Sequence, residues 1–245
     1  MMKHIEIKSY AGKILRGYLH LPAINTGNIV IMFHGFTGNK TEHGGHFRDL
    51  SRLLEINNIA SLRMDFSGNG ESDGTFRDFT FSSMTSEANQ LLDYVQGLAG
   101  IKNIILLGYS MGGALAAWLA GKRVNEISKL VLWSPAGNIN EMIKHKYEVT
   151  PKLSNGDADC GSYPLSMEMY KSLADYNLLE NVNNFNKPVY IIHGKKDMAV
   201  NYEVSLKYEK LYPNAVLHLI DSAGHGYDRS GEKDELLKKT YDFVR

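Results

Sequence analysis

The sequence predicts an α/β protein built on a mostly parallel, doubly wound sheet of about eight strands. Short apolar stretches rich in strand-forming residues alternate with stretches of helical character, which is the pattern of βαβ units. Several strands, such as residues 29–33, are apolar throughout, as is typical of parallel strands covered by helices on both faces. One long stretch interrupts the alternation. We therefore expect a single domain over residues 1–245 with an inserted lid at about residues 136–178.

The expected strands begin with a hairpin, because two strand-like stretches are joined through Ala11-Gly12. The full set of expected strands is residues 4–10, 13–21, 29–33, 59–66, 103–107, 129–133, 188–193 and 215–220. Helices are expected where apolar residues recur at helical spacing or where alanine is abundant. They cover residues 47–55, 86–98, 113–120, 203–211 and 233–244. This order predicts parallel neighbours joined by right-handed crossovers.

The interrupting stretch, residues 136–178, shows little regular pattern. It contains aromatic and methionine side chains at Tyr147, Tyr163, Met167, Met169, Tyr170 and Tyr176. A connection of this length without regular structure is usually a functional lid or insertion. No repeat, low-complexity tract or flexible linker divides the rest of the chain.

Composition excludes several classes of partner. The 27 basic and 27 acidic residues balance, so no field of one sign is available to hold nucleic acid or an anionic membrane. The single cysteine, Cys160, cannot form an internal disulfide. The first residues alternate like a strand rather than a signal peptide, and no stretch of about 18 apolar residues occurs. We expect a cytoplasmic protein with a small-molecule substrate, and leave a homodimer open.

A serine between two glycines lies where an expected strand meets an expected helix. This segment, Gly108-Tyr109-Ser110-Met111-Gly112, matches the G-x-S-x-G nucleophile elbow. So sharp a turn forces strained torsions on Ser110 and leaves no room for side chains at positions 108 and 112. The hydroxyl of Ser110 would then lie at a helix N-terminus, which favours developing negative charge. Ser110 is the predicted nucleophile.

A serine hydroxyl is a weak nucleophile and needs a base, which in turn must be oriented. Where this elbow occurs, an acid and then a histidine follow the serine, each after a later strand. Asp197 and His225 both follow expected strands near the end of the chain, in that order. We predict His225 as the general base and Asp197 as the group that orients its imidazole. Asp221 and Asp228 flank His225 and remain alternative acids.

Acyl transfer at Ser110 would also need an oxyanion hole made of backbone N–H groups. One should come from the residue after the nucleophile, which is Met111. The other should come from the loop after residues 29–33, where His34-Gly35-Phe36 has the HG-x form and makes Phe36 the donor.

Two patterns suggest a metal or a cofactor, and neither is complete. His43 and His46 have ligand-like spacing, but no third ligand is placed to help them, so we expect a solvated helix entry and no metal. Gly68-Asn69-Gly70 resembles the start of a dinucleotide fingerprint, but Asp73 stands where the third glycine belongs, so no cofactor is expected. His193 precedes Asp197 and is expected only to shape the backbone.

The chain resembles the α/β-hydrolases, and within them the small bacterial cinnamoyl (feruloyl) esterases. The superfamily motifs are HGF at residues 34–36, GYSMG at 108–112, GKKD at 194–197 and AGHG at 223–226. The features shared with the esterases are HGFTG at residues 34–38, RMDFSGNGESDG at 63–74 and the length and place of the lid. The resemblance extends over nearly the whole sequence.

This resemblance implies cofactor-free hydrolysis of carboxylic esters, with hydroxycinnamates such as ferulate or chlorogenate as substrates. In such esterases a lid tyrosine holds the phenolic end of the substrate, and Tyr170 occupies the corresponding region. Tyr109 and Met111 stand where these esterases tend to have His and Gln, and make the elbow more similar to those of lysophospholipases and monoacylglycerol lipases.

Other functions remain as alternatives. A short-chain carboxylesterase or a monoacylglycerol- or lysophospholipase-type lipase is the second interpretation. A non-catalytic binding protein of the same fold is remote, because all three catalytic positions are intact. A peptidase is disfavoured, because no second domain is present to bind a peptide.

Overall fold

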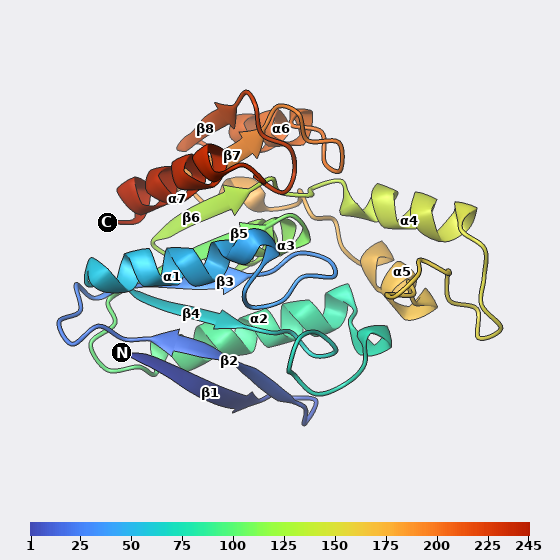
Figure 1. Ribbon diagram of the computed structural model, residues 1–245, viewed down its shortest axis with the longest axis horizontal. Coiled ribbons are helices and arrows are strands. Elements are labelled where there is room, and N and C mark those ends of the chain that lie inside the picture. The colour runs from blue at the N-terminus through green and yellow to red at the C-terminus, as the bar shows by residue number, and fades with distance from the viewer.

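The computed structural model describes residues 1–245, and its centre is one eight-stranded sheet (Figure 1). The strand order is β1-β2-β4-β3-β5-β6-β7-β8. The strands are β1 (Met2–Lys8), β2 (Ile14–His20), β3 (Asn28–Phe33), β4 (Ala60–Met64), β5 (Asn103–Tyr109), β6 (Lys129–Trp133), β7 (Val189–Gly194) and β8 (Ala215–Ile220). Only β2 runs against its neighbours, and every other neighbouring pair is parallel. The predicted mostly parallel sheet is confirmed.

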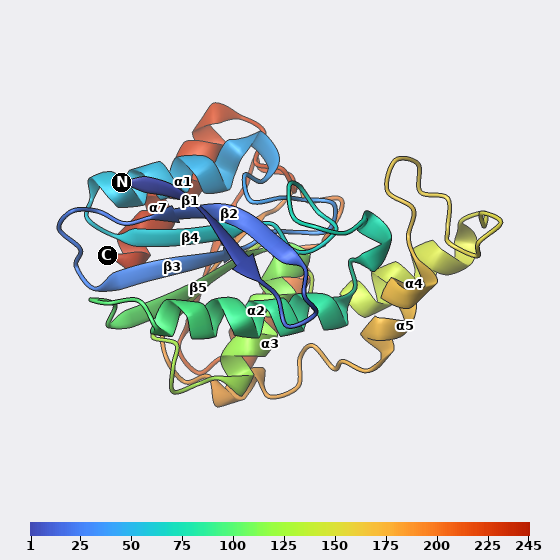
Figure 2. The same ribbon diagram turned by 90° about the horizontal axis from the view of Figure 1, so that it is seen from below.

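Helices cover both faces of the sheet. They are α1 (His46–Ile56), α2 (Phe81–Gln96), α3 (Met111–Lys122), α4 (Ile139–Val149), α5 (Met167–Ala174), α6 (Glu203–Leu211) and α7 (Ser230–Val244), with short 3₁₀ turns η1 (His43–Gly45), η2 (Phe76–Asp78) and η3 (Val182–Asn184). Figure 2 shows α1 and α7 on one side of the sheet and α2 and α3 on the other. The central strands are therefore buried on both faces, which explains why they are apolar throughout.

The β6–β7 segment, residues 134–188, contains α4 and α5, which lie beyond the carboxyl ends of the parallel strands (Figure 1). The expectation of little regular structure here was wrong. Ile139, Ile143 and Tyr147 recur every four residues along α4 and are buried in the larger of the two cores. Met169 and Leu173 do the same for α5. Nearby prolines and glycines had obscured this spacing in the sequence.

Other boundaries differ by a few residues. The largest change is at α2, which begins at Phe81 rather than at residue 86. The Thr80 hydroxyl accepts a hydrogen bond from the N–H of Ser83, and the Ser83 hydroxyl accepts one from the N–H of Thr80. This reciprocal cap fixes the earlier start. None of the helices combines the length and apolar character that a bilayer-crossing segment needs.

Candidate active site

The predicted elbow joins β5 to α3, and its backbone is strained as expected. Ser110 has φ 56° and ψ −119°, a conformation that non-glycine residues rarely adopt. A Cβ on Gly108 would lie 2.0 Å from the carbonyl oxygen of Gly112, and a Cβ on Gly112 would lie 2.0 Å from that of Phe33. The two glycines are therefore required by close backbone packing, as predicted.

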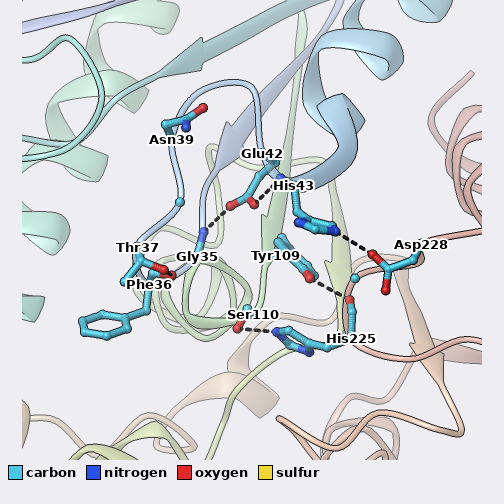
Figure 3. A pocket seen from close by; sticks show the side chains of 12 residues that line it. Gly35, Phe36, Thr37, Asn39, Glu42, His43, Tyr109, Ser110, His225 and Asp228 are labelled. Carbon is cyan, nitrogen blue, oxygen red and sulfur yellow. Dashed lines mark hydrogen bonds and ion pairs between the residues drawn. The ribbon is translucent and has the colours of Figure 1, made fainter. Parts of the chain in front are cut away.

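The structure brings the three predicted catalytic side chains together in series. His225 Nε2 lies 3.0 Å from Ser110 Oγ, and His225 Nδ1 lies 2.6 Å from Asp197 Oδ2 (Figure 3 shows the first contact). Because the carboxylate can only accept, Nδ1 carries the proton and Nε2 is free to accept from the Ser110 hydroxyl. The imidazole is thus held in the tautomer that a general base needs.

Asp197 is a buried carboxylate whose two oxygens both have donors. Oδ1 accepts from the N–H groups of Ala199 at 2.9 Å and Val200 at 2.7 Å. Burial by itself would raise the pKa of Asp197, but hydrogen bonds from His193, His225 and Val200 outweigh it and hold the pKa well below its usual range. The group is therefore an anion that faces His225.

His193 has a contact that sequence reasoning missed. Its Nε2 lies 3.1 Å from Asp197 Oδ2 and 2.9 Å from the carbonyl oxygen of Val200. Both neighbours accept, so Nε2 is protonated, and Nδ1 accepts from the Ser205 hydroxyl at 2.6 Å. The side chain is fully buried and helps fix the carboxylate that orients His225. Its place at the end of β7, four residues before Asp197, was the only sequence signal.

The two predicted oxyanion donors come from different segments: Phe36 lies in the loop after β3, and Met111 directly follows Ser110. Met111 is the first residue of α3, so its N–H has no acceptor within the helix. The N–H of Phe36 donates to no other backbone group. The loop that contains Phe36 packs closely on the nucleophile, since a Cβ on Gly35 would lie 3.2 Å from Ser110 Cβ. Both N–H groups are therefore available to a bound oxyanion.

Two more residues hold this arrangement and were not predicted. The buried carboxylate of Glu42 accepts from the N–H of Gly35 at 2.6 Å and from the N–H of His43 at 2.9 Å (Figure 3). Tyr109 stacks on the imidazole of His225, with ring centroids 5.1 Å apart, and its hydroxyl donates to the His225 carbonyl at 2.6 Å. The Glu42 contacts hold the loop that contains Phe36, and the Tyr109 contacts hold the imidazole of His225.

Ser110 and His225 lie between two cavities of different character. The larger, which we call the polar cavity, has a volume of about 490 Å³ (Figure 3). Its lining is Gly35, Phe36, Thr37, Gly38, Asn39, Glu42, His43, Tyr109, Ser110, His225, Gly226 and Asp228. The lining contains two carboxylates, Glu42 and Asp228, and no lysine or arginine; His43 Nε2 lies 2.6 Å from Asp228 Oδ1.

The second cavity, which we call the apolar cavity, has a volume of about 220 Å³ and lies under α4. Its lining is Phe36, Ser110, Ile139, Met142, Ile143, Lys146, Ala199, Val200 and His225. Lys146 is the only lysine in this lining, which has no arginine, aspartate or glutamate, and it forms no ion pair. An apolar group bound here would reach Ser110 from the side of the β6–β7 segment.

Tyr170, the predicted substrate-binding residue, lines neither of these cavities. Its ring stacks on that of Tyr147, with centroids 4.8 Å apart and planes 7° from parallel. It borders a separate cavity between α4 and α5. A substrate that touches Tyr170 would have to extend past α4, so the contact stays a prediction.

The remaining sequence candidates lie away from the reacting atoms. Asp221 pairs with Lys195 and Asp228 with His43, so neither contacts His225 as an acid. No cluster of three or more metal-ligating side chains is present. The solvated helix entry expected at His43 and His46 is right only for His43. His46 is buried, and its Nε2 lies 2.7 Å from the Gly226 carbonyl oxygen. This contact joins α1 to the loop that holds His225.

Comparisons with known proteins identify relatives over most of the chain. The family model described as "Serine aminopeptidase, S33" matches residues 25–155. Human serine hydrolase BPHL is 24% identical over 247 residues, which cover 93% of this chain and 83% of that protein. Lysophosphatidylserine lipase ABHD12 from Macaca fascicularis is 27% identical over 183 residues, which cover 73% of this chain and 44% of that protein. The chain therefore spans less than half the length of the latter.

Among solved structures, Est1E from Butyrivibrio proteoclasticus with ferulic acid bound is similar over the whole fold. The TM-score is 0.87 at 28% sequence identity, and the match covers 98% of this chain and 97% of that chain. Mouse α/β-hydrolase domain-containing protein 10 matches with a TM-score of 0.80 at 20% identity, covering 99% and 98% of the two chains. The second likeness concerns the fold alone.

Proposed function

Because the chain belongs to the serine aminopeptidase S33 family and has the α/β-hydrolase fold, we propose that it is a serine carboxylic-ester hydrolase. The observation that carries this proposal is the hydrogen-bonded series from Ser110 through His225 to Asp197. The nucleophile lies within hydrogen-bond distance of the base, and the base within hydrogen-bond distance of the orienting acid. Two free backbone N–H groups beside the nucleophile complete the requirements for acyl transfer.

In the proposed reaction, Ser110 Oγ attacks the ester carbonyl carbon while its proton passes to His225 Nε2. The carbonyl oxygen becomes an anion that accepts hydrogen bonds from the N–H groups of Phe36 and Met111. The bond to the alcohol oxygen then breaks, and the proton on His225 goes to that oxygen. Water attacks the acyl-enzyme with His225 as base, the acid leaves, and Ser110 regains its proton.

We propose hydroxycinnamoyl esters as the preferred substrates, with the acyl group in the apolar cavity and residues 136–178 acting as its lid. Three observations support this assignment. The cavity is lined by Ile139, Met142 and Ile143, which suit an aromatic acyl group. Lys146 also lines the cavity, and its ammonium group can donate a hydrogen bond to an oxygen on the aromatic ring of such an acyl group. Est1E, the structural relative with 28% identity, binds ferulic acid.

A lipase that acts on monoacylglycerols or lysophospholipids is the second candidate. The specific observation in its favour is that sequence relatives include lysophosphatidylserine lipase and human monoglyceride lipase. An aliphatic chain would also find apolar walls in the same cavity. A short-chain carboxylesterase would use the same site.

The decisive experiment combines active-site labelling with a substrate series. A serine-directed phosphonate should label the protein at Ser110, and Ser110→Ala should abolish both labelling and turnover, a loss of about 10⁶-fold in kcat. Ser222→Ala, at an exposed serine in the loop before His225, is the control. Unchanged labelling of Ser110→Ala would remove the assignment.

The substrate series compares methyl ferulate, methyl butyrate, a monoacylglycerol and an aminoacyl anilide. Preference for methyl ferulate supports the hydroxycinnamoyl assignment. Preference for aliphatic esters would overturn it in favour of the lipase or short-chain esterase. Cleavage of the anilide alone would instead indicate the peptidase activity that gives the family its description.

A further inference from the structure

Four aromatic side chains join the loop after β3 to the β6–β7 segment. The ring of Phe36 meets that of Phe76 edge to face, with centroids 5.3 Å apart. Phe76 in turn meets Tyr163 edge to face, with centroids 5.0 Å apart. Phe79 packs beside both phenylalanines, with its centroid 5.6 Å from that of Phe76 and 6.3 Å from that of Phe36. A chain of ring contacts therefore runs from Tyr163 to the residue whose N–H is a predicted oxyanion donor.

The ring of Phe36 borders open space. Phe36 lines both the polar cavity, of about 490 Å³, and the apolar cavity, of about 220 Å³. Glu42 holds the N–H of Gly35 at 2.6 Å, but that contact does not reach the side chain of Phe36. Packing against Phe76 and Phe79 therefore opposes movement of the Phe36 ring into either cavity.

The two supporting phenylalanines differ in how firmly they are held. Phe79 is buried in the larger of the two cores. Phe76 is only partly buried, and it is the first residue of the short turn η2. Its aromatic neighbours are Phe36, Phe79 and Tyr163. Loss of the Tyr163 ring would expose Phe76 further to solvent and leave it free to move away from Phe36.

The tip of the β6–β7 segment, residues 151–166, holds Tyr163 against η2. A second contact joins the same two parts of the chain, because Arg77 Nε lies 3.2 Å from Asp157 Oδ2. The carboxylate of Asp157 is buried, so it needs this partner. Arg77 directly follows Phe76 along the chain. The ion pair and the ring contact therefore dock the tip at one place.

We propose that Tyr163 is a positioning residue for the oxyanion hole. Its ring keeps Phe76 packed against Phe36, and the loop then presents the Phe36 N–H beside Ser110 as an oxyanion requires. This inference rests on the proposed esterase function, because the oxyanion forms only during acyl transfer. It goes beyond that function, since the β6–β7 segment then influences the rate for every ester and not only the choice of acyl group. The hydrogen-bonded catalytic series does not pass through these rings.

The first test measures kcat for methyl acetate. Tyr163 lines neither cavity beside Ser110, and both groups of this ester are small, so the substrate has no need of the tip. Tyr163→Ala should lower kcat about fivefold to tenfold and change KM by less than about twofold. The loss should be smaller than the hundredfold or more that removal of an oxyanion donor costs, because the donor is displaced and not removed.

Three further variants locate the effect in the ring contact. Tyr163→Phe keeps the contact with Phe76 and should keep kcat within about twofold. Leu153→Ala removes another exposed apolar side chain of the tip and should leave kcat unchanged. Phe76→Leu should lower kcat by itself, and Tyr163→Ala added to it should lower kcat by less than about twofold more, because the two residues act in one chain.

A second measurement does not depend on turnover. The N–H groups of Gly35 and Gly38 donate to Glu42 and to the Gly35 carbonyl, so their exchange with deuterium reports opening of the loop that contains them. In Tyr163→Ala both should exchange about threefold to tenfold faster than in the unmodified protein. The control variant of the tip should show the unmodified rates.

The outcomes separate this inference from the proposed function. If Tyr163→Ala leaves either kcat or the exchange rates unchanged, the inference is overturned and the esterase function stands. A loss confined to KM would make Tyr163 a substrate contact, and losses that add in full in the double variant would show that it does not act through Phe76. Both results would overturn the inference. If no ester is turned over, the proposed function fails, and the exchange rates still decide whether Tyr163 holds the loop.

Discussion

The carboxylate of Glu42 accepts a hydrogen bond from the backbone N–H of Gly35 at 2.6 Å, and so fixes the loop that presents the Phe36 N–H beside Ser110. Glu42 itself has φ 60° and ψ 167°, a region of backbone space used almost only by glycine. A non-glycine residue persists there only when its side chain is firmly held. The strain and the buried carboxylate together point to a positioning role in the oxyanion hole.

We expect Glu42→Ala to lower kcat by about tenfold to a hundredfold with little change in KM, because loss of one oxyanion donor typically costs about a hundredfold or more. Glu42→Gln keeps an oxygen that can accept from the Gly35 N–H and should retain most of the activity. Steady-state kinetics on one methyl ester measure both. Equal losses in the two variants, or a loss confined to KM, would contradict the positioning role.

We expect His193→Ala to lower kcat by about tenfold and to move the acid limb of the kcat/KM profile to higher pH. Removal of the Nε2–H takes away one of the donors that hold the pKa of Asp197 below its usual range, so that pKa rises. Ser205→Ala is the matched control, because it removes only the partner of the opposite ring nitrogen. A folded His193→Ala protein with an unchanged pH profile would show that the residue is purely structural.

We expect Met142→Trp to fill the apolar cavity and to discriminate among acyl groups. The value of kcat/KM for methyl ferulate should fall about tenfold or more, and that for methyl acetate by less than about twofold, since a small acyl group needs little of the cavity. Val149→Trp, at an exposed position on the same helix, serves as the control. Equal losses for both esters would place the acyl group elsewhere.

Tyr170→Phe tests the substrate contact that the sequence resemblance implied. The ring and its stack on Tyr147 remain, and only the hydroxyl is lost. If that hydroxyl holds the phenolic end of the substrate, KM for methyl ferulate should rise about fivefold while KM for methyl butyrate stays constant. The same KM values as in the unmodified protein would leave Tyr170 with a packing role only.

Asp49 gives a pH-dependent stability prediction. Hydrogen bonds from Arg48 and Lys233 lower the pKa of Asp49 from 3.8 to about 2, and the contact with Lys233 links α1 to α7. A lowered folded-state pKa stabilises the fold above pH 4, and this stabilisation is lost as the pH falls towards 2. Asp49→Asn should therefore lose about 1 kcal/mol of unfolding free energy at pH 7.

Urea unfolding at pH 7, 5 and 3 measures this loss, which should shrink at the lowest pH. Asp242→Asn, at a half-buried carboxylate on α7 whose partner Lys238 lies on the same helix, should lose much less. A loss for Asp49→Asn that is the same at all three pH values would assign the effect to packing rather than to charge.

The sheet and the positions of Ser110, Asp197 and His225 could be predicted because each depends on local rules. A buried parallel strand must be apolar, a nucleophile elbow needs glycines on both sides, and a functional side chain at a parallel sheet follows a strand end. The carboxyl ends of neighbouring strands meet at one edge, so chain order alone placed three distant residues together. The structure places the three side chains within hydrogen-bond distance in series.

The supporting contacts could not be predicted because they join loops whose paths no local rule determines. Glu42 reaches Gly35 from a backbone conformation, φ 60° and ψ 167°, that no sequence pattern indicates, and the sequence shows simply a polar stretch before α1. His193 looks like any residue at a strand end until the turn to Asp197 brings the two together. The helices α4 and α5 were missed because they are short, so their buried apolar residues repeat only two or three times, and prolines and glycines nearby suggested irregular structure.

The chain leaves the sheet at Trp133 and returns to it at Val189 on the very next strand, β7, which pairs with β6 along its length. The hydrogen bonds between β6 and β7 therefore hold both ends of the β6–β7 segment in place. We expect that residues after Ala136, whose N–H donates to the Ser110 carbonyl at 2.9 Å, can be added, removed or exchanged in the β6–β7 segment without altering the spacing of the reacting groups. We expect that evolution can change which acyl groups this enzyme accepts while Ser110, Asp197 and His225 keep their positions.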